Sequence, residues 1–182
     1  MRVSWAIADN FADLNVDPDK LTDIGSTWGS WRTWRAWNTD NVLCCDGNKT
    51  KDLIARAFQA VCNLYIKNSH FAEAGRPMGV NLFEGEYTAE FDNQEEVITL
   101  HLLASQNDIV LLLGYNVEDC DSTDQMQKHK RTNYLNAMYS VCKMNEDVQW
   151  VFIDYPTNLP ERFDDLENVT CDSFENVLEL LS

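Results

Sequence analysis

Four tryptophans at intervals of three residues, with two arginines between them, are the most unusual local feature of the sequence. The six side chains are Trp28, Trp31, Arg32, Trp34, Arg35 and Trp37. Indole faces and guanidinium planes stack on flat rings, so the segment is a candidate site for a nucleobase, a sugar or a partner protein. A strand would divide the tryptophans between two faces, and a helix would spread them widely. We therefore expect most of them to pack in the core, with the arginine stems over the rings.

Three aspartates, each directly after an apolar run typical of a strand, form the second candidate site. They are Asp9, Asp46 and Asp154. Ligands of open α/β sheets bind beyond the carboxyl ends of parallel strands, so these carboxylates would converge if their strands were parallel neighbours. Such a group could hold Mg²⁺ or transfer a proton. Turns and helix N-caps also favour aspartate, and we expect that structural role over a metal site.

The run Asp46-Gly47-Asn48-Lys49-Thr50 has the Gly-x-Lys-Thr spacing of a phosphate loop between a strand and a helix. It lacks the first glycine of that loop, and the Asp46 carboxylate would repel a phosphate group. The three histidines have no obvious catalytic or metal-binding partner in the sequence. The sequence therefore predicts neither a phosphate loop nor a histidine metal site.

The elements that must position these residues alternate between strands and helices. Strands are predicted at 3–8, 41–45 and 149–153, and a helical apolar stripe covers 49–67. A second helix, capped by Ser122 or Thr123, is predicted to run to Lys143, and a third covers residues 172–181. The helix that ends at Lys143 and the strand after it predict a β-α-β crossover.

Two apolar runs in the middle of the chain predict a β-hairpin. Val97–Ala104 and Ile109–Tyr115 have the length of strands, and the polar residues 105–108 are a connection short enough to pair them antiparallel. The predicted fold is therefore α/β or α+β, a mixed β-sheet with helices packed on it, in which this hairpin precedes the β-α-β crossover.

The composition indicates one globular domain over residues 1–182. The chain is 45% apolar, with 14 Lys and Arg against 30 Asp and Glu, a net charge of -16 and a pI near 4.3. This charge disfavours direct binding to nucleic acid or to an anionic membrane, and favours a basic partner. Neither a signal peptide nor a membrane span is recognisable, so we expect a cytoplasmic protein with reduced cysteines.

The N-terminal third resembles uncharacterised small acidic accessory proteins of tailed bacteriophages. The resemblance is carried by the run from Ile24 to Arg35, by Thr39-Asp40-Asn41-Val42 and by Arg56-Ala57-Phe58-Gln59-Ala60-Val61-Cys62-Asn63. It implies a viral origin, an accessory role and a place in the host-cell cytoplasm. It transfers no catalytic residue.

Charge and resemblance together predict a non-enzymatic protein that binds and modulates or inhibits a host protein. The target would be a defence or nucleic-acid-processing factor, with exposed tryptophans as anchors. The first alternative is a small α/β enzyme or a sequestering protein for a nucleotide-like ligand, with Asp9, Asp46 or Asp154 handling Mg²⁺ or a proton. The second is a virion or assembly component that forms homo-oligomers. No cofactor is expected, and Mg²⁺ is the alternative that the three aspartates leave open.

Overall fold

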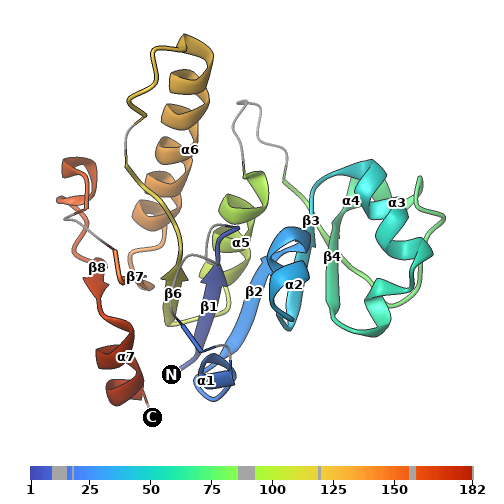
Figure 1. Cartoon of the computed structure of the whole chain (residues 1–182), viewed down its shortest axis with the longest axis horizontal. Coiled ribbons are helices and arrows are strands. Elements are labelled where there is room, and N and C mark those ends of the chain that lie inside the picture. The colour runs from blue at the N-terminus through green and yellow to red at the C-terminus, as the bar shows by residue number, and fades with distance from the viewer. Residues whose placement is uncertain (10–15, 18, 86–92, 119, 156–158, 182) are drawn as a thin grey trace.

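Eight parallel strands form one sheet in the computed structural model, which describes residues 1–9, 16–17, 19–85, 93–118, 120–155 and 159–181. The strand order is β5-β4-β3-β2-β1-β6-β7-β8, and every neighbouring pair is parallel (Figure 1). The strands are β1 (Val3–Ile7), β2 (Ser26–Ser30), β3 (Asn41–Cys44), β4 (Asn63–Lys67), β5 (Asn81–Phe83), β6 (Ile109–Leu113), β7 (Gln149–Ile153) and β8 (Val169–Asp172).

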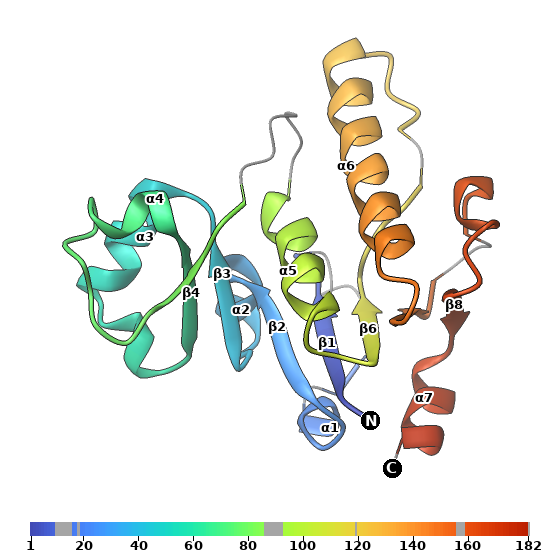
Figure 2. The same cartoon turned by 180° about the vertical axis from the view of Figure 1, so that it is seen from behind.

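Helices join most of the strands. They are α1 (Asp19–Thr22), α2 (Trp31–Ala36), α3 (Gly47–Ala55), α4 (Asn68–Phe71), α5 (Gln94–Ala104), α6 (Gln125–Met144) and α7 (Phe174–Leu181), with 3-10 turns η2 (Phe58–Ala60) and η3 (Glu161–Phe163). The N-terminal half of α6 extends beyond the carboxyl ends of the strands (Figures 1 and 2). None of the helices formed by the described residues combines the length and apolar character that a bilayer crossing requires.

The helices cover both faces of the sheet, with α5 and α6 on the face seen in Figure 2 and α1 and α2 on the face seen in Figure 1. Side chains of β1 alternate between these layers. Ala6 belongs to the cluster that contains Val97 of α5, whereas Trp5 packs with Leu21 of α1 and Phe174 of α7. Such a sheet needs apolar side chains on both of its faces, which explains the nearly continuous apolar sequence of β1 and β6.

The predicted hairpin, and with it the mixed sheet, is wrong. Residues of the run Val97–Ala104 lie in α5, and β6 pairs in parallel with β1 and β7. The error has a physical cause: α5 packs against the sheet and, along its side, against α6, so Val97, Leu100 and Leu103 are fully buried and few polar residues mark an exposed face. An apolar run of this kind looks the same whether it forms a buried strand or a buried helix.

The predicted helix 49–67 is also too long. The structure ends α3 at Ala55, turns the chain through Ala57 at a φ of 54°, and starts β4 at Asn63. Leu64 and Ile66 are buried side chains of that strand. Leu64 fits the predicted helical stripe because the short 3-10 turn η2 extends the helical apolar pattern from α3 towards β4.

Other parts of the prediction are confirmed. The fold is α/β, the strands predicted at 3–8, 41–45 and 149–153 correspond to β1, β3 and β7, and the long helix corresponds to α6. The units β6, α6 and β7 form the predicted parallel crossover. The tryptophan-rich segment is a strand and then a helix, since β2 ends at Ser30 and α2 begins at Trp31.

Strand β1 lies at the point where the order of the sheet reverses. The chain moves from β1 to β2 and outward to β5, then returns through α5 to β6 on the other side of β1. Loops that leave such neighbouring strands in opposite directions create a crevice at their carboxyl ends, which is where ligands bind in open α/β sheets. The residues that follow β1 and β6 are therefore the first place to look for a functional site.

Candidate functional site

Asp9 lies directly beyond β1 and is tied to the first turn of α2. Its Oδ1 accepts hydrogen bonds from Ser30 Oγ and from Thr33 Oγ1, the latter at 3.0 Å. Arg32 Nη1 lies 3.4 Å from its Oδ2. Ser30 also caps α2, because its Oγ accepts from the backbone N–H groups of Arg32 and Thr33. The cap of α2 thus fixes the orientation of the Asp9 carboxylate.

Two buried glutamates from the first turn of α5 reach the same place. Glu95 Oε1 accepts from the backbone N–H of Cys45 at 3.2 Å, and its Oε2 lies 4.0 Å from Arg32 Nη1. Glu96 Oε1 accepts from the backbone N–H of Asp9 at 3.3 Å. Carboxylates in the first turn of a helix are stabilised by the helix dipole. The dipole of α5 therefore offsets part of the free-energy cost of burying Glu95 and Glu96.

Glu96 is the most deeply placed acid of this group, at 6% exposure. Its Oε2 accepts a hydrogen bond from Tyr134 Oη of α6 at 2.5 Å, and its backbone carbonyl accepts from Tyr115 Oη at 3.2 Å. We call Asp9, Arg32, Glu95, Glu96 and Tyr134 the carboxyl-edge cluster. It joins the end of β1 to α2 on one face of the sheet and to α5 and α6 on the other.

The electrostatics of the carboxyl-edge cluster suit proton transfer near neutral pH. Burial, opposed by the hydrogen bond from Tyr134 and assisted by the charge of Asp9, raises the pKa of Glu96 to about 7. Burial and the charge of Glu96 also raise the pKa of the Tyr134 hydroxyl well above its ordinary value. A carboxyl group with a pKa near 7 can both donate and accept a proton at that pH.

A hollow of about 300 Å³ opens beside Tyr134. It is lined by Asn93, Cys120, Gln127, Lys130, Arg131 and Tyr134. Arg131 fixes one wall, since its Nε donates to the carbonyl of Glu118 at 2.8 Å and its guanidinium lies 5.1 Å from the centre of the Tyr134 ring. Asn93, just before α5, has a φ of 58°. Backbone in this conformation is uncommon outside glycine and often occurs at functional sites.

A second hollow, of about 430 Å³, lies at the carboxyl ends of β4 and β5. Its lining includes Lys67, Phe83 and Glu84. Lys67 Nζ lies 3.5 Å from Oε1 of Gln94, the first residue of α5. The start of α5 therefore lies between the two hollows, because Asn93 lines the first and Gln94 contacts Lys67, which lines the second.

The tryptophans predicted as a binding surface mostly pack inside the protein. Trp28 is 4% exposed and contacts Tyr65, with ring centres 4.8 Å apart. Trp34 meets Phe58 edge to face at 4.3 Å, and Trp37 packs against the core formed by β1 and α7. Trp31 differs from them, because cations surround its ring. Trp28 is thus buried, whereas Trp31, Trp34 and Trp37 are half-buried against core residues.

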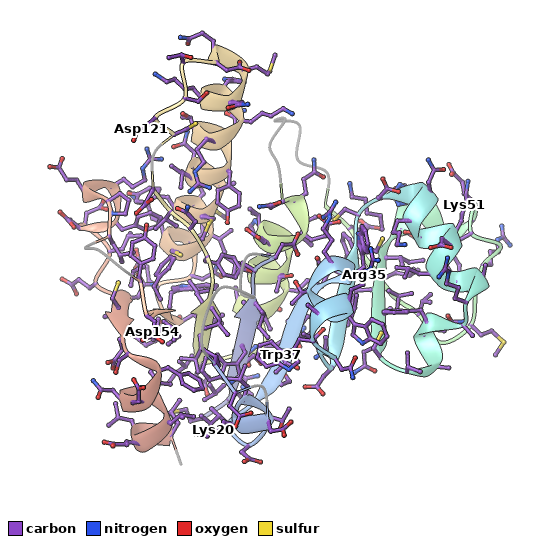
Figure 3. The ribbon with its side chains drawn as sticks, in the orientation of Figure 1. Lys20, Arg35, Trp37, Lys51, Asp121 and Asp154 are labelled. Atoms are coloured by element: carbon purple, nitrogen blue, oxygen red, sulfur yellow. The ribbon has the colours of Figure 1, made fainter. Side chains whose placement is uncertain are left out.

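Asp46 and Asp154 do not join Asp9. Asp46 caps α3, with its Oδ1 accepting from the backbone N–H of Lys49 at 2.6 Å, and Asp154 Oδ1 accepts from the N–H of Phe174 at 3.1 Å. Neighbouring strands lie about 4.8 Å apart, so the ends of β3 and β7, four strands apart, are about 19 Å from each other. Figure 3 shows Asp154 on the other side of the sheet's centre from Arg35, which belongs to α2. The condition for convergence is therefore not met, because β3, β1 and β7 are parallel but are not neighbours in the sheet.

The described residues form no group of three or more His, Cys, Asp or Glu side chains arranged to hold a metal ion. Asp46 and Asp154 hold helix termini, and the Asp9 carboxylate already accepts bonds from Ser30 and Thr33. The structural role that the sequence favoured over a Mg²⁺ site is the one that Asp46 has as the N-cap of α3.

Sequence reasoning missed Glu95, Glu96 and Tyr134. One signal was present: Gln94-Glu95-Glu96 stands directly before an apolar run, and acidic residues are typical of a first helical turn. Had the run been identified as a helix, the two glutamates would have marked its start. Tyr134 could not have been found in this way, because only the packing of α6 on α5 brings it to Glu96.

Comparison with known proteins does not assign the chain to a family. No family model matches it, and neither a curated protein nor a solved structure does. The resemblance to bacteriophage accessory proteins therefore stays a prediction, and the function must be argued from the geometry of the site.

Proposed function

We propose that the carboxyl-edge cluster is the active site of an enzyme that acts on a nucleotide-like small molecule by acid–base catalysis. The observation that carries the proposal is Glu96, a buried carboxyl group with a pKa of about 7, bonded to a tyrosine that lines an open hollow. Perturbed acids of this kind concentrate at catalytic sites, because a general acid or base works best with a pKa near the working pH.

The proposal assigns different tasks to the members of the cluster. Glu96 exchanges a proton with the substrate, and Tyr134, between Glu96 and the hollow, relays or orients that proton. Asp9 and Glu95 share Arg32 as their counter-ion. Charged groups fixed in advance in this way stabilise charge that develops on a reacting molecule.

The position in the fold supports the class of substrate. The cluster lies at the reversal of strand order in a parallel sheet, where open α/β proteins bind nucleotides. Carboxylates there are acceptors for the hydroxyl groups of a ribose. Proteins that share a fold can act on different substrates, and the assay described next therefore compares candidate substrates directly.

The expectation of a host-protein partner stays a prediction, as does that of a virion component. The host-binding hypothesis uses exposed tryptophans as anchors, whereas Trp28, Trp34 and Trp37 pack against other side chains of the described chain. The geometry therefore gives more support to the first alternative, an enzyme for a nucleotide-like molecule.

The test is an activity assay with the common nucleosides and nucleotides, read by liquid chromatography and mass spectrometry. We expect the wild type to convert at least one of them, and Glu96→Gln, which keeps the size of the side chain, to lose about a hundredfold or more in rate. The control is Glu179→Gln, which makes the same change at an exposed position of α7 and should retain the full rate.

The pH profile of the rate completes the test. A fall in rate above pH 7 would assign Glu96 as a general acid, and a fall below pH 7 would assign it as a general base. A profile with no break near pH 7, an unchanged rate in Glu96→Gln, or no conversion of any nucleoside or nucleotide would contradict the proposal.

A further inference from the structure

Three cationic side chains surround the indole ring of Trp31. Arg32 Cζ lies 4.9 Å from the ring centre, Arg35 Cζ 5.9 Å and Lys49 Nζ 4.5 Å. Trp31 and the two arginines belong to α2, and Lys49 belongs to the first turn of α3, so the cations come from helices that follow neighbouring strands. We call these four residues the Trp31 platform.

The Trp31 platform is a positive region of a strongly acidic protein. The whole chain carries a net charge of -16, yet residues 28–67 contain six cations against only Asp40, Asp46 and Asp52. The six are Arg32, Arg35, Lys49, Lys51, Arg56 and Lys67. Cations gathered around one ring repel each other, and an anion placed among them would relieve that repulsion.

The acids nearby neutralise the platform only in part. Arg32 pairs with Asp9 at 3.4 Å, and Lys49 pairs with Asp52 at 2.8 Å. Asp52 is shared, because it also accepts from Arg56 Nε at 2.9 Å. Arg35 is exposed and has no carboxylate partner among the residues that the structure describes. Within the part of the chain that the structure describes, Arg35 is therefore the platform cation whose charge no carboxylate compensates.

Arg32 connects the Trp31 platform to the carboxyl-edge cluster. The same guanidinium lies over Trp31 and reaches the carboxylates of Asp9 and Glu95. Its side chain is 50% exposed, so part of its hydrogen-bonding capacity faces solvent. An anion held by Arg35, Lys49 and the free side of Arg32 would lie next to the acids that we assign to proton transfer.

We propose that the Trp31 platform binds the phosphate group of the substrate, so that the enzyme acts on nucleotides in preference to nucleosides. This inference rests on the proposed function, since it names the substrate class of the same site. Two arginines offer planar forks that match phosphate oxygens, and a lysine adds a point charge. Because cations surround the indole, Trp31 serves to hold them in place, and they make the contact with the ligand.

The experiment compares the four ribonucleoside 5′-monophosphates, the matching nucleosides and inorganic phosphate by calorimetric titration. Arg35→Gln/Lys49→Gln removes two platform cations. Lys20→Gln/Lys51→Gln removes the same charge from exposed positions outside the platform, which Figure 3 shows on α1 and on α3. Each pair of ligands differs only in the phosphate group, and each pair of variants only in where the charge is lost.

We expect at least one monophosphate to bind the wild type about tenfold or more tightly than its nucleoside, which is a common gain from a charged contact. Arg35→Gln/Lys49→Gln should lose this preference, and Lys20→Gln/Lys51→Gln should keep it. Inorganic phosphate should compete with the monophosphate. Equal affinities for nucleotide and nucleoside, or an unchanged preference in Arg35→Gln/Lys49→Gln, would overturn the inference.

Failure of this inference differs from failure of the proposed function. Glu96→Gln should keep the preference for the monophosphate while it loses turnover, because it leaves the Trp31 platform intact. Turnover of nucleosides without any phosphate preference would refute the platform and retain the acid–base site. Phosphate binding that depends on Arg35 and Lys49 without any turnover would do the reverse.

Discussion

Asp9 and Asp154 both follow apolar strands of the same sheet, yet their surroundings differ. Asp9 lies beyond β1 and contacts Ser30 at the end of β2 and Arg32 and Thr33 of α2, while its backbone N–H donates to Glu96. Asp154 lies beyond β7, where its Oδ1 accepts from a backbone N–H at the start of α7. The local sequences are similar, so the position of the strand in the sheet decides which aspartate meets other charged groups.

The largest expected effect on the free energy of unfolding is at Glu96, the buried acid that contacts Asp9. Its pKa rises from 4.5 to about 7 on folding, so the folded chain keeps a proton at pH values where the unfolded chain has released it. The free energy of unfolding should therefore fall as pH rises from about 4.5 to 7, by about 3 kcal/mol, and stay level above that range. Urea denaturation across this range measures it.

Glu96→Gln should remove most of that pH dependence and should be more stable than the wild type at pH 8. The amide carries no charge to bury, and it can accept from the N–H of Asp9 while it donates to Tyr134 Oη. Glu179→Gln is the matched control, and its stability should follow the wild-type pH curve. A wild-type stability that does not change between pH 4.5 and 7 would contradict the assignment of a perturbed acid.

For Asp154, we expect substitutions to lower the free energy of unfolding and to leave nucleotide affinity unchanged. Asp154→Ala removes the acceptor for the N–H of Phe174. It also puts alanine, which has no polar side chain, at a backbone φ of 49°. Together these changes should cost about 2 kcal/mol, measured by urea denaturation. Asp154→Gly removes the same acceptor, but glycine adopts this positive φ without strain, so its loss of free energy of unfolding should be smaller. A change in nucleotide affinity in either variant would break the distinction between Asp9 and Asp154.

Asp46, a third aspartate that follows a strand, lies next to the Trp31 platform and can be compared with Asp9 and Asp154. It caps α3 through the N–H of Lys49, and Asp46→Ala should lower the free energy of unfolding by about 1 kcal/mol. Asp46→Ser keeps a capping oxygen and should recover most of this loss. Because Asp46 carries a negative charge near Lys49, both variants should bind inorganic phosphate at least as tightly as the wild type. Weaker phosphate binding in Asp46→Ser would assign Asp46 to the ligand site.

The smallest effect on stability is expected at Arg32. Its ion pairs with Asp9 and Glu95 are 3.4 and 4.0 Å long, and its side chain is half exposed, so solvent screens them. Arg32→Gln should change the free energy of unfolding by less than about 1 kcal/mol at moderate salt. The same variant should weaken the binding of monophosphates, which titration checks. A large loss of stability without weaker binding would mean that Arg32 holds the fold and not a ligand.

The sequence predicted the α/β class, the long helix α6 and the strands β1, β3 and β7, because each has a strong local pattern. It could not predict strand order, since the pairing of β1 with β6 joins residues that are far apart in the chain. It also could not separate a buried helix from a buried strand in Val97–Ala104, where Val97 and Leu100 are fully buried in α5. That single error produced the hairpin and concealed the first turn of α5.

The candidate site depended on the same long-range information. Asp9 and Arg32 were named from the sequence, and the structure places them 3.4 Å apart. Asp46 and Asp154 were named for the same reason as Asp9 and turned out to cap helices. Glu95 and Glu96 needed the path of α5 across the sheet, and Tyr134 needed the contact of α6 with α5. Residue types identified candidates, and only the topology could choose among them.

The central place of β1 also governs how the chain can fold during synthesis. Strand β1 precedes all other strands, but its partner β6 pairs Ile109 with Val3, so 106 residues separate the two. Until β6 has left the ribosome, one edge of β1 has no strand to pair with, and such an edge can pair with other chains. Sheets built from distant segments fold slowly. Nascent chains that stop before Ile109 should therefore aggregate or depend on chaperones, whereas chains that extend past β6 should be able to close the centre of the sheet.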